Sequence, residues 1–293
     1  MASKYLDEFE KLNTTVDTIY DLGDLEVLII LKDGTNLTCW DDVENIKDVI
    51  YISEDLSNLT KLDWKYEDFV SLKAIVAYGV TNKIISMEHM FQGCLSLKDI
   101  SSLSTWDVSN VTSMSCMFHN CHSLKDISSL STWDVSNVED MSFIFGGFPE
   151  YVDMSSLNDL SALKDWDVSN VEDMGCMFRG CSDLVDLSAL KDWDVSNVKN
   201  MAEMFAGCSS LMDLSSLSHW DTSGVTDMGR MFLGCSSLDD LAPLSNWDVS
   251  NVKDMGEMFC ECSGLVDLSV LKDWDVCNVT DMSEMFCECS GLV

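Results

Sequence analysis

The sequence predicts a repeat solenoid in which each rung carries one short strand and one short helical or 3-10 turn, with an α+β cap at its N-terminal end. A unit of 27 residues recurs eight times over residues 79–293, and the same slots of every unit hold apolar side chains. Residues 1–78 show no such repeat. A unit of this length cannot bury its own apolar face, so neighbouring units must stack on one another.

Tryptophan marks the repeat most clearly. Counted from each Trp, the unit reads Trp-Asp-Val-Ser-Asn-Val, then Asp-Met-x-x-Met-Phe-x-Gly-Cys, then Ser-x-Leu-x-Asp-Leu-Ser-x-Leu. One step of 33 residues interrupts the spacing and indicates a six-residue insertion near residues 149–154, which we expect to project from the stack as a loop. The last unit is incomplete. The seven tryptophans are Trp106, Trp133, Trp166, Trp193, Trp220, Trp247 and Trp274.

Residues 1–78 are predicted to form a capping domain, because an open solenoid end would expose apolar core. A separate ligand-binding domain is the alternative. Leu25–Leu31 is typical of a strand and Leu37–Trp40 of its return strand. Asp41–Val49 is predicted as a short helix and Val49–Ile52 as a further strand. Trp64–Tyr78 is apolar enough to lie against the first repeat.

Within each unit, Leu-x-Asp-Leu-Ser-x-Leu suits a strand followed by a corner. Asp-Met-x-x-Met-Phe suits one helical or 3-10 turn with Asp as its N-cap, since the two Met residues are three apart. The glycine two residues after Phe, such as Gly180, is then expected to end the turn with a positive φ. The Asn of each unit is expected to bond the backbone at a corner.

Repeated Met, Phe, Cys and Trp slots predict the core. The Trp rings are expected to pack on the solenoid with the indole N–H pointing outward; a stacking platform for sugars or peptides is the alternative. One slot takes Cys in seven units and Phe148 in the eighth, which identifies it as apolar. We therefore expect buried free thiols and a reducing compartment. The slot holds Cys94, Cys121, Cys181, Cys208, Cys235, Cys262 and Cys289.

Composition and charge exclude several classes of function. The chain has 51 acidic and 17 basic residues, a formal charge of −34, which disfavours nucleic-acid binding and suits cations or basic partners. The longest apolar run, Val27–Leu31, is far below the roughly 20 residues of a spanning helix, and no signal-peptide pattern is present. The sequence therefore predicts a protein that stays in the cytoplasm. Because no histidine lies in a repeated slot beside a nucleophile, it also predicts a non-enzymatic protein without a cofactor.

The repeat resembles the BspA-like leucine-rich repeat surface proteins. The likeness is carried by pairs such as Met117–Cys121 with Trp133–Val138, and Met204–Cys208 with Trp220–Val225, and it recurs in all eight units. The resemblance implies a leucine-rich-repeat-like solenoid. It also implies adhesion or host interaction at a cell surface, and it supplies no catalytic residues.

Two columns of aspartate follow from the period. One column follows each Trp, from Asp107 to Asp275; the other lies in the predicted strand and is called here the acidic ladder. Stacked carboxylates are expected to raise one another's pKa. We expect each Asp to bond a local backbone N–H at a turn, and weak Ca²⁺ binding by the stacked oxygens is the alternative. The acidic ladder comprises Asp99, Asp126, Asp159, Asp186, Asp213, Asp240 and Asp267.

Two groups of possible zinc ligands are not predicted to bind metal, because part of each belongs to the inward Cys slot. One group surrounds Cys116 and His119, and the other brings Cys260 and Cys287 together with Cys262 and Cys289. In an oxidising compartment, Cys260 and Cys287 are the pair expected to form a disulfide.

The predicted function is a protein–protein interaction scaffold that presents an extended acidic surface to basic or polar partners. Specificity in repeat proteins comes from positions that vary within a fixed frame. Two alternatives remain open: an adhesin for host protein or glycan, and an acidic repeat array stabilised by Ca²⁺. The predicted partner-binding positions, called here the variable column, are Lys98, Lys125, Asn158, Val185, Met212, Asp239 and Val266.

Overall fold

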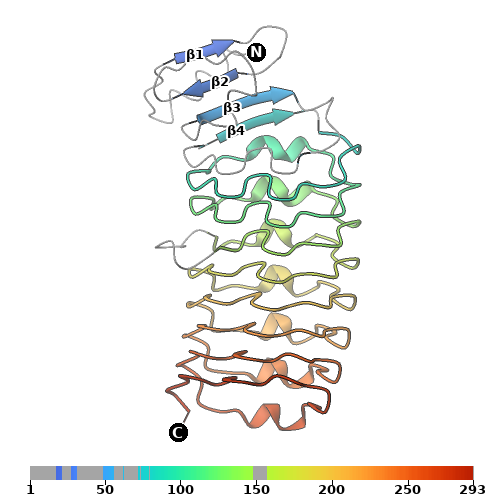
Figure 1. The fold of residues 1–293 in the computed structure, drawn as a ribbon, viewed down its shortest axis with the longest axis vertical. Helices are drawn as coiled ribbons and strands as arrows, with labels where there is room; N and C mark the ends of the chain where they lie inside the picture. Colours follow the sequence, from blue (N-terminus) through green and yellow to red (C-terminus); the bar gives the residue numbers. More distant parts are fainter. Residues whose placement is uncertain are drawn as a thin grey trace.

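The protein is an elongated stack of repeats with a small sheet at its N-terminal end and the C-terminus at the other end (Figure 1). The structure, a computed structural model, describes residues 18–21, 28–31, 49–55, 62, 72, 74–78, 80–147 and 157–292. Within these ranges, no helix is long and apolar enough to cross a membrane.

The N-terminal sheet has four strands in the order β1-β2-β3-β4. These are β1 (Thr18–Asp21), β2 (Leu28–Leu31), β3 (Val49–Asp55) and β4 (Ala74–Tyr78), with β3 and β4 parallel and the other pairs antiparallel. Strands β2 and β3 confirm the strands predicted within residues 25–31 and 49–52. The strand predicted at residues 37–40 lies outside the described residues, and so does the helix predicted over Asp41–Val49 except for Val49, which begins β3.

Strand β4 joins the sheet to the first repeat. The Ile75 N–H donates to the Asp99 carbonyl at 3.2 Å, and the Ser102 hydroxyl donates to the Ile75 carbonyl at 3.0 Å. Ile75 and Leu72 are fully buried in the same apolar core as the repeats. The sheet therefore covers the first rung, although the exact division between residues 78 and 79 stays a prediction.

Each rung is joined to the next by a parallel backbone bridge rather than by a strand. The bridges link Ser86 to Ser113 and continue at the same slot to Asp281. The Asp140–Asp173 bridge spans the 33-residue step, so the insertion leaves the register of the stack unchanged; residues 148–156 are outside the described ranges. In the first rung Asp99 of this segment bridges to strand β4, whereas the Leu-x-Asp-Leu and Leu-x-Asp-Ile segments of the later described rungs make no bridge, so the predicted strand is wrong for those rungs.

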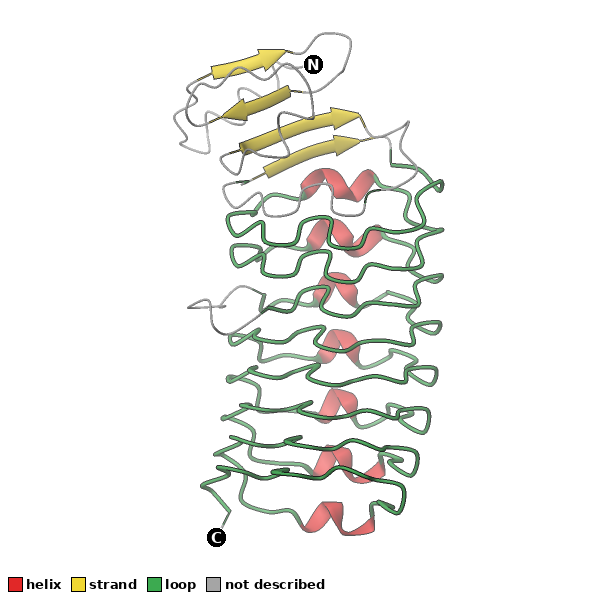
Figure 2. Cartoon of the chain, in the orientation of Figure 1, coloured by secondary structure: helices red, strands yellow, loops and turns green. Residues whose placement is uncertain are grey.

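A 3-10 helix is present in each described rung from residue 101 onward, but not where it was predicted. Each helix begins at the Ser or Ala that directly follows an Asp-Leu or Asp-Ile pair, not in Asp-Met-x-x-Met-Phe. The helices lie one above another on one side of the stack (Figure 2). They are η3 (Ser101–Thr105), η4 (Ser128–Thr132), η5 (Ser161–Leu163), η6 (Ser188–Leu190), η7 (Ser215–Leu217), η8 (Ala242–Asn246) and η9 (Ser269–Asp273).

The Met-x-x-Met-Phe segment is not helical because positive φ angles interrupt it. Gly207 has a φ of 76°, which confirms the expected glycine, and Glu203 has a φ of 55°. Left-handed residues turn alternate N–H groups away from their own rung. In one rung these groups donate to the next rung at 2.6–3.0 Å: Met201 to the Asp227 carbonyl, Glu203 to Gly229, Phe205 to Met231 and Gly207 to Leu233.

The core consists of aligned columns. Phenylalanine rings from Phe91 to Phe286 stack with centroid separations of 5.4–6.1 Å. The predicted Met slots are fully buried beside them from Met87 to Met258. Since the same residue type recurs in the same slot, each side chain packs on its own counterpart one rung away.

The tryptophans are buried, but their N–H groups do not point outward as predicted. From Trp133 onward, each indole Nε1–H donates to a Leu carbonyl of the preceding rung at 2.9–3.2 Å. The rings are only 4–9% exposed, so their faces offer no platform for a sugar or peptide. The Asn side chains make a similar bond, as Asn197 Nδ2 donates to the Ser169 carbonyl at 2.7 Å, which confirms their predicted role.

The inward cysteines are free and buried, as predicted. Their thiols also make a bond that the sequence did not indicate. Cys208 Sγ donates to the Phe178 carbonyl at 3.3 Å, and the thiols of four other rungs do the same at 3.0–3.2 Å. Phe148 lies outside the described residues. Each rung is therefore tied to its neighbour by backbone, indole, amide and thiol donors.

We predict that Trp193→Phe lowers the free energy of unfolding by about 1–3 kcal/mol, because it leaves the Leu163 carbonyl without its indole donor. Thermal and urea denaturation measure the change. Val185→Ala, at an exposed position, is the control and should cost less than about 0.5 kcal/mol. Equal stability of the two variants would contradict the role given to the indole bond.

Candidate interaction surface

Two exposed columns lie side by side on the face that carries the 3-10 helices. Every residue of the acidic ladder and of the variable column is exposed. The ladder Asp precedes the first residue of each helix by two positions, and the variable residue precedes that Asp. The structure thus places the residues predicted from sequence on one continuous surface. Their role in partner binding stays a prediction.

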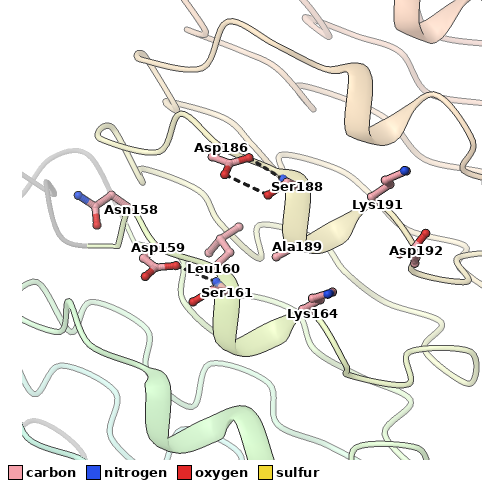
Figure 3. A pocket seen from close by; sticks show the side chains of 10 residues that line it. All are labelled: Asn158, Asp159, Leu160, Ser161, Lys164, Asp186, Ser188, Ala189, Lys191 and Asp192. Carbon is pink, nitrogen blue, oxygen red and sulfur yellow. Dashed lines mark hydrogen bonds between the residues drawn. The ribbon is translucent and has the colours of Figure 1, made fainter.

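Each ladder carboxylate is fixed by the backbone that follows it. Its Oδ1 accepts the N–H two residues later at 2.7–2.9 Å, as Asp186 does from Ser188 (Figure 3). The Ser hydroxyl adds a second bond to Asp186, Asp213 and Asp267 at 2.8–3.0 Å. This geometry confirms the expectation that the carboxylates bond local N–H groups.

These hydrogen bonds outweigh repulsion between rungs. Hydrogen bonds from the Ser128 hydroxyl and N–H lower the pKa of Asp126, and those from the Ser161 N–H and hydroxyl lower the pKa of Asp159. The charge of Asp126 acts in the opposite direction on Asp159 but is the smallest contribution. The pKa of Asp267 is lowered in the same way by Ser269. The expectation that stacking raises the pKa of these ladder residues is therefore wrong.

The aspartates that follow each Trp also accept the N–H two residues later. Asp107 Oδ1 accepts the Ser109 hydroxyl at 2.6 Å and the Ser109 N–H at 3.2 Å, and these bonds lower its pKa. Asp167 and Asp248 also have lowered pKa values, again through the Ser two residues later. The lowered pKa values keep Asp107, Asp167 and Asp248 ionised at neutral pH.

The variable column changes character along the stack. Lys98 and Lys125 occupy it near the N-terminal sheet. Farther along, Val185 and Met212 are each 56% exposed and Val266 is 67% exposed. Large apolar side chains that face solvent beside a row of carboxylates combine apolar contact with negative charge.

Shallow cavities lie between successive 3-10 helices on this face. A cavity of about 530 Å³ separates η5 from η6, and one of about 270 Å³ lies between η3 and η4. Lys164 and Lys191 line the larger cavity at the ends of η5 and η6, while Asp159 and Asp186 line it at their beginnings (Figure 3). Ladder residues therefore border both cavities.

A third acidic column, at the slot of the backbone bridges, was missed as a distinct feature. Its Asp-Met pattern predicts a helix N-cap, and each Asp indeed accepts the N–H two residues later, although no helix follows. Burial raises the pKa of Asp227, helped by the charges of Asp254 and Asp173. At Asn200 the column is neutral, and Nδ2 donates to both Asp173 oxygens at 3.1 Å.

An ion-pair ladder on the Met-Phe segments was also missed. Glu203 Oε2 lies 3.0 Å from Arg179 Nε and its Oε1 lies 3.9 Å from an Arg230 nitrogen, while Arg230 also pairs with Glu257. Glu203, Arg230 and Glu257 all occupy the slot with positive φ. The sequence signal for this ladder is the positive-φ slot itself, where neutral Cys176 is followed in the next units by residues of alternating charge, Glu203, Arg230 and Glu257.

Among the described residues, no three His, Cys, Asp or Glu side chains are placed to hold a metal ion. The groups around Cys116 and around Cys260 are thus not assembled as metal sites. The His119 side chain is instead buried, which lowers its pKa to about 4, and its ring meets Phe143 edge-on at 5.3 Å.

The chain matches the model of one known protein family. A family model described as Mycoplasma protein of unknown function, DUF285, matches residues 60–156, 150–263 and 210–292. The chain belongs to the DUF285 family. The overlapping DUF285 matches agree with the stacked repeats, so the chain is a repeat protein. No curated protein and no solved structure matches it.

For this DUF285 protein we predict that Asp227→Asn raises the melting temperature at neutral pH, corresponding to about 0.5–1 kcal/mol. The folded-state pKa of Asp227 is raised, so its ionised form destabilises the fold above that pKa, and the penalty disappears as the pH falls below the unfolded value of 3.8. The Asn oxygen still accepts the Gly229 N–H, as Asn200 Oδ1 accepts that of Ala202.

The measurement is a series of melting curves between pH 7 and pH 3.5. Asp240→Asn removes the same charge from an exposed position and serves as the control. A gain for Asp227→Asn that matches the control, or that persists unchanged at low pH, would show that the Asp227 carboxylate carries no penalty.

Proposed function

We propose that this protein is a non-enzymatic scaffold that binds a basic or polar protein partner along the acidic ladder and the variable column. We further propose that its stack is a leucine-rich-repeat-like solenoid of the BspA-like type, as the repeat motif suggests. The observation that carries the proposal is the exposed column of differing residues beside a fixed row of carboxylates. Extended repeat surfaces obtain specificity from such substituted positions.

Charge supports a basic partner. The formal charge of −34 raises the local concentration of cations and speeds association with positively charged segments. The ladder carboxylates keep their outer oxygen surfaces exposed while Oδ1 accepts a local N–H. Val185, Met212 and Val266 add apolar contact area in the same column. A partner segment with alternating basic and apolar side chains complements both features.

The state of the nucleophiles favours a binding role over catalysis. Burial raises the pKa of Cys181 to about 12 and that of Cys176 to about 12, so these thiols stay protonated at neutral pH. The lowered pKa of the buried His119 leaves it neutral. Nucleophilic catalysis by cysteine requires a thiolate, which these protonated thiols do not supply.

Adhesion at a cell surface is the second candidate. It is favoured by the likeness of the Met-Phe-x-Gly-Cys and Trp-Asp-Val-Ser-Asn-Val segments to BspA-like surface proteins. In that setting the same column would contact a host protein.

The binding test uses a fluorescent peptide of alternating Lys and Leu, with an alternating Glu and Leu peptide for comparison. We expect the basic peptide to bind and its affinity to fall with salt. Replacing Val185, Met212 and Val266 together by Ser should weaken binding roughly tenfold, since each exposed apolar side chain contributes about 0.5 kcal/mol. Fluorescence anisotropy measures both effects.

The matched control is Ile85→Ser, because Ile85 is 60% exposed but lies outside the variable column. It should leave the affinity unchanged. If the triple variant and Ile85→Ser bind the basic peptide equally well, binding reflects overall charge alone and the proposed surface is wrong.

A further inference from the structure

One slot of the repeat holds two cysteines in neighbouring rungs. The residue directly after the repeated Phe is Cys260 in one rung and Cys287 in the next. The preceding rungs place no cysteine in this slot, which holds Gln92, His119, Gly146, Arg179, Ala206 and Leu233. The pair is therefore not part of the repeated core.

The stack brings the two side chains into contact. The Glu261 N–H donates to the Cys287 carbonyl at 2.7 Å, which fixes the two rungs in register at this slot. The Cys287 thiol is close enough to Cys260 to help raise the pKa of the Cys260 thiol, and both cysteines are free. Cys260 is 5% exposed, whereas Cys287 is half-buried.

We propose that Cys260 and Cys287 are a redox modification site that forms a reversible disulfide between adjacent rungs. Equivalent residues of paired backbones lie about 4.8 Å apart, which is within the Cα separation of about 4.4–6.8 Å that a disulfide spans. The bond closes a loop between equivalent positions of two repeats and restrains them against separation.

The inward cysteines two residues away are not expected to form this disulfide, because their thiols are engaged elsewhere. Cys262 and Cys289 donate to the Phe232 and Phe259 carbonyls at 3.1 and 3.0 Å, and both are buried. Their thiols point to a backbone acceptor rather than to each other. Only the Cys260–Cys287 pair combines thiol contact with partial access among the described cysteines.

The reaction requires a small disulfide as the oxidant. The Cys287 thiolate attacks one sulfur of that disulfide, forming a mixed disulfide and releasing one small thiolate. The Cys260 thiolate then attacks Cys287 Sγ, so the protein disulfide forms and the second small thiolate leaves. Two protein thiols lose two electrons and two protons, and the oxidant gains them as two small thiols.

The surroundings select the kind of oxidant. Burial, the Cys287 thiol and the carboxylates of Glu261 and Glu257 together raise the pKa of Cys260 to about 12. Formation of the disulfide should thus accelerate as the pH rises. The same carboxylates attract a cationic disulfide and repel an anionic one, so cystamine should react faster than oxidised glutathione, and salt should reduce the difference.

The experiment uses the full chain with Cys277→Ser, which removes an exposed thiol. The protein is incubated with cystamine near about pH 8.5, where ordinary thiols are half ionised, and is then alkylated, digested and analysed by mass spectrometry. We expect the Cys260 and Cys287 peptides to be joined, with the loss of two hydrogen atoms. The melting temperature should rise on oxidation and return after reduction.

Variants separate this pair from other cysteines. Cys260→Ser should stop the reaction at a mixed disulfide on Cys287, and Cys289→Ala should leave the Cys260–Cys287 bond intact. Circular dichroism verifies that each variant folds. Recovery of both residues in alkylated form, a bond from either residue to another cysteine, or a disulfide between two chains would overturn the proposal.

Discussion

The structure depends on donors that reach from one rung to the next. Alternate N–H groups of the Met-x-x-Met-Phe segment leave their own rung because residues such as Glu203 and Gly207 adopt positive φ. A left-handed non-glycine residue costs about 1–2 kcal/mol, and the inter-rung bonds offset that cost. Indole, amide and thiol donors add further links at other points of the same rung. Stability is therefore a property of neighbouring pairs of repeats rather than of a single repeat.

Sequence periodicity predicted the features of this fold that depend on which side chains are buried. The stack and the buried Trp, Phe and Cys columns follow from apolar residues that return every 27 positions. The local backbone could not be read in the same way, because Met at positions three apart suits a helical turn as well as the interrupted segment observed. His, Cys, Phe, Glu and Arg occupy one left-handed slot, so no glycine marked it. The 3-10 helix consequently lies in a different part of the rung from the one predicted.

The surface was predicted more completely than its electrostatics. Residues that vary within the frame, such as Lys98 and Met212, proved exposed because the frame fixes which slots face inward. The direction of the pKa of Asp126 was predicted wrongly, since sequence shows neighbouring charges but not the Ser128 hydroxyl and N–H groups that stabilise the carboxylate. The half-buried Asp227 shows the reverse balance, as burial there outweighs its one backbone bond.

Native-state hydrogen exchange at single-residue resolution tests the inter-rung ladder most directly. The account predicts that the amides of Met201, Glu203, Phe205 and Gly207 exchange only through opening of neighbouring rungs, so they should be among the slowest in the chain. The Ser188 amide, held only by the exposed Asp186 carboxylate, should exchange far faster. Exchange of Glu203 and Phe205 at the rate of Ser188 would contradict the claim that these bonds hold the stack together.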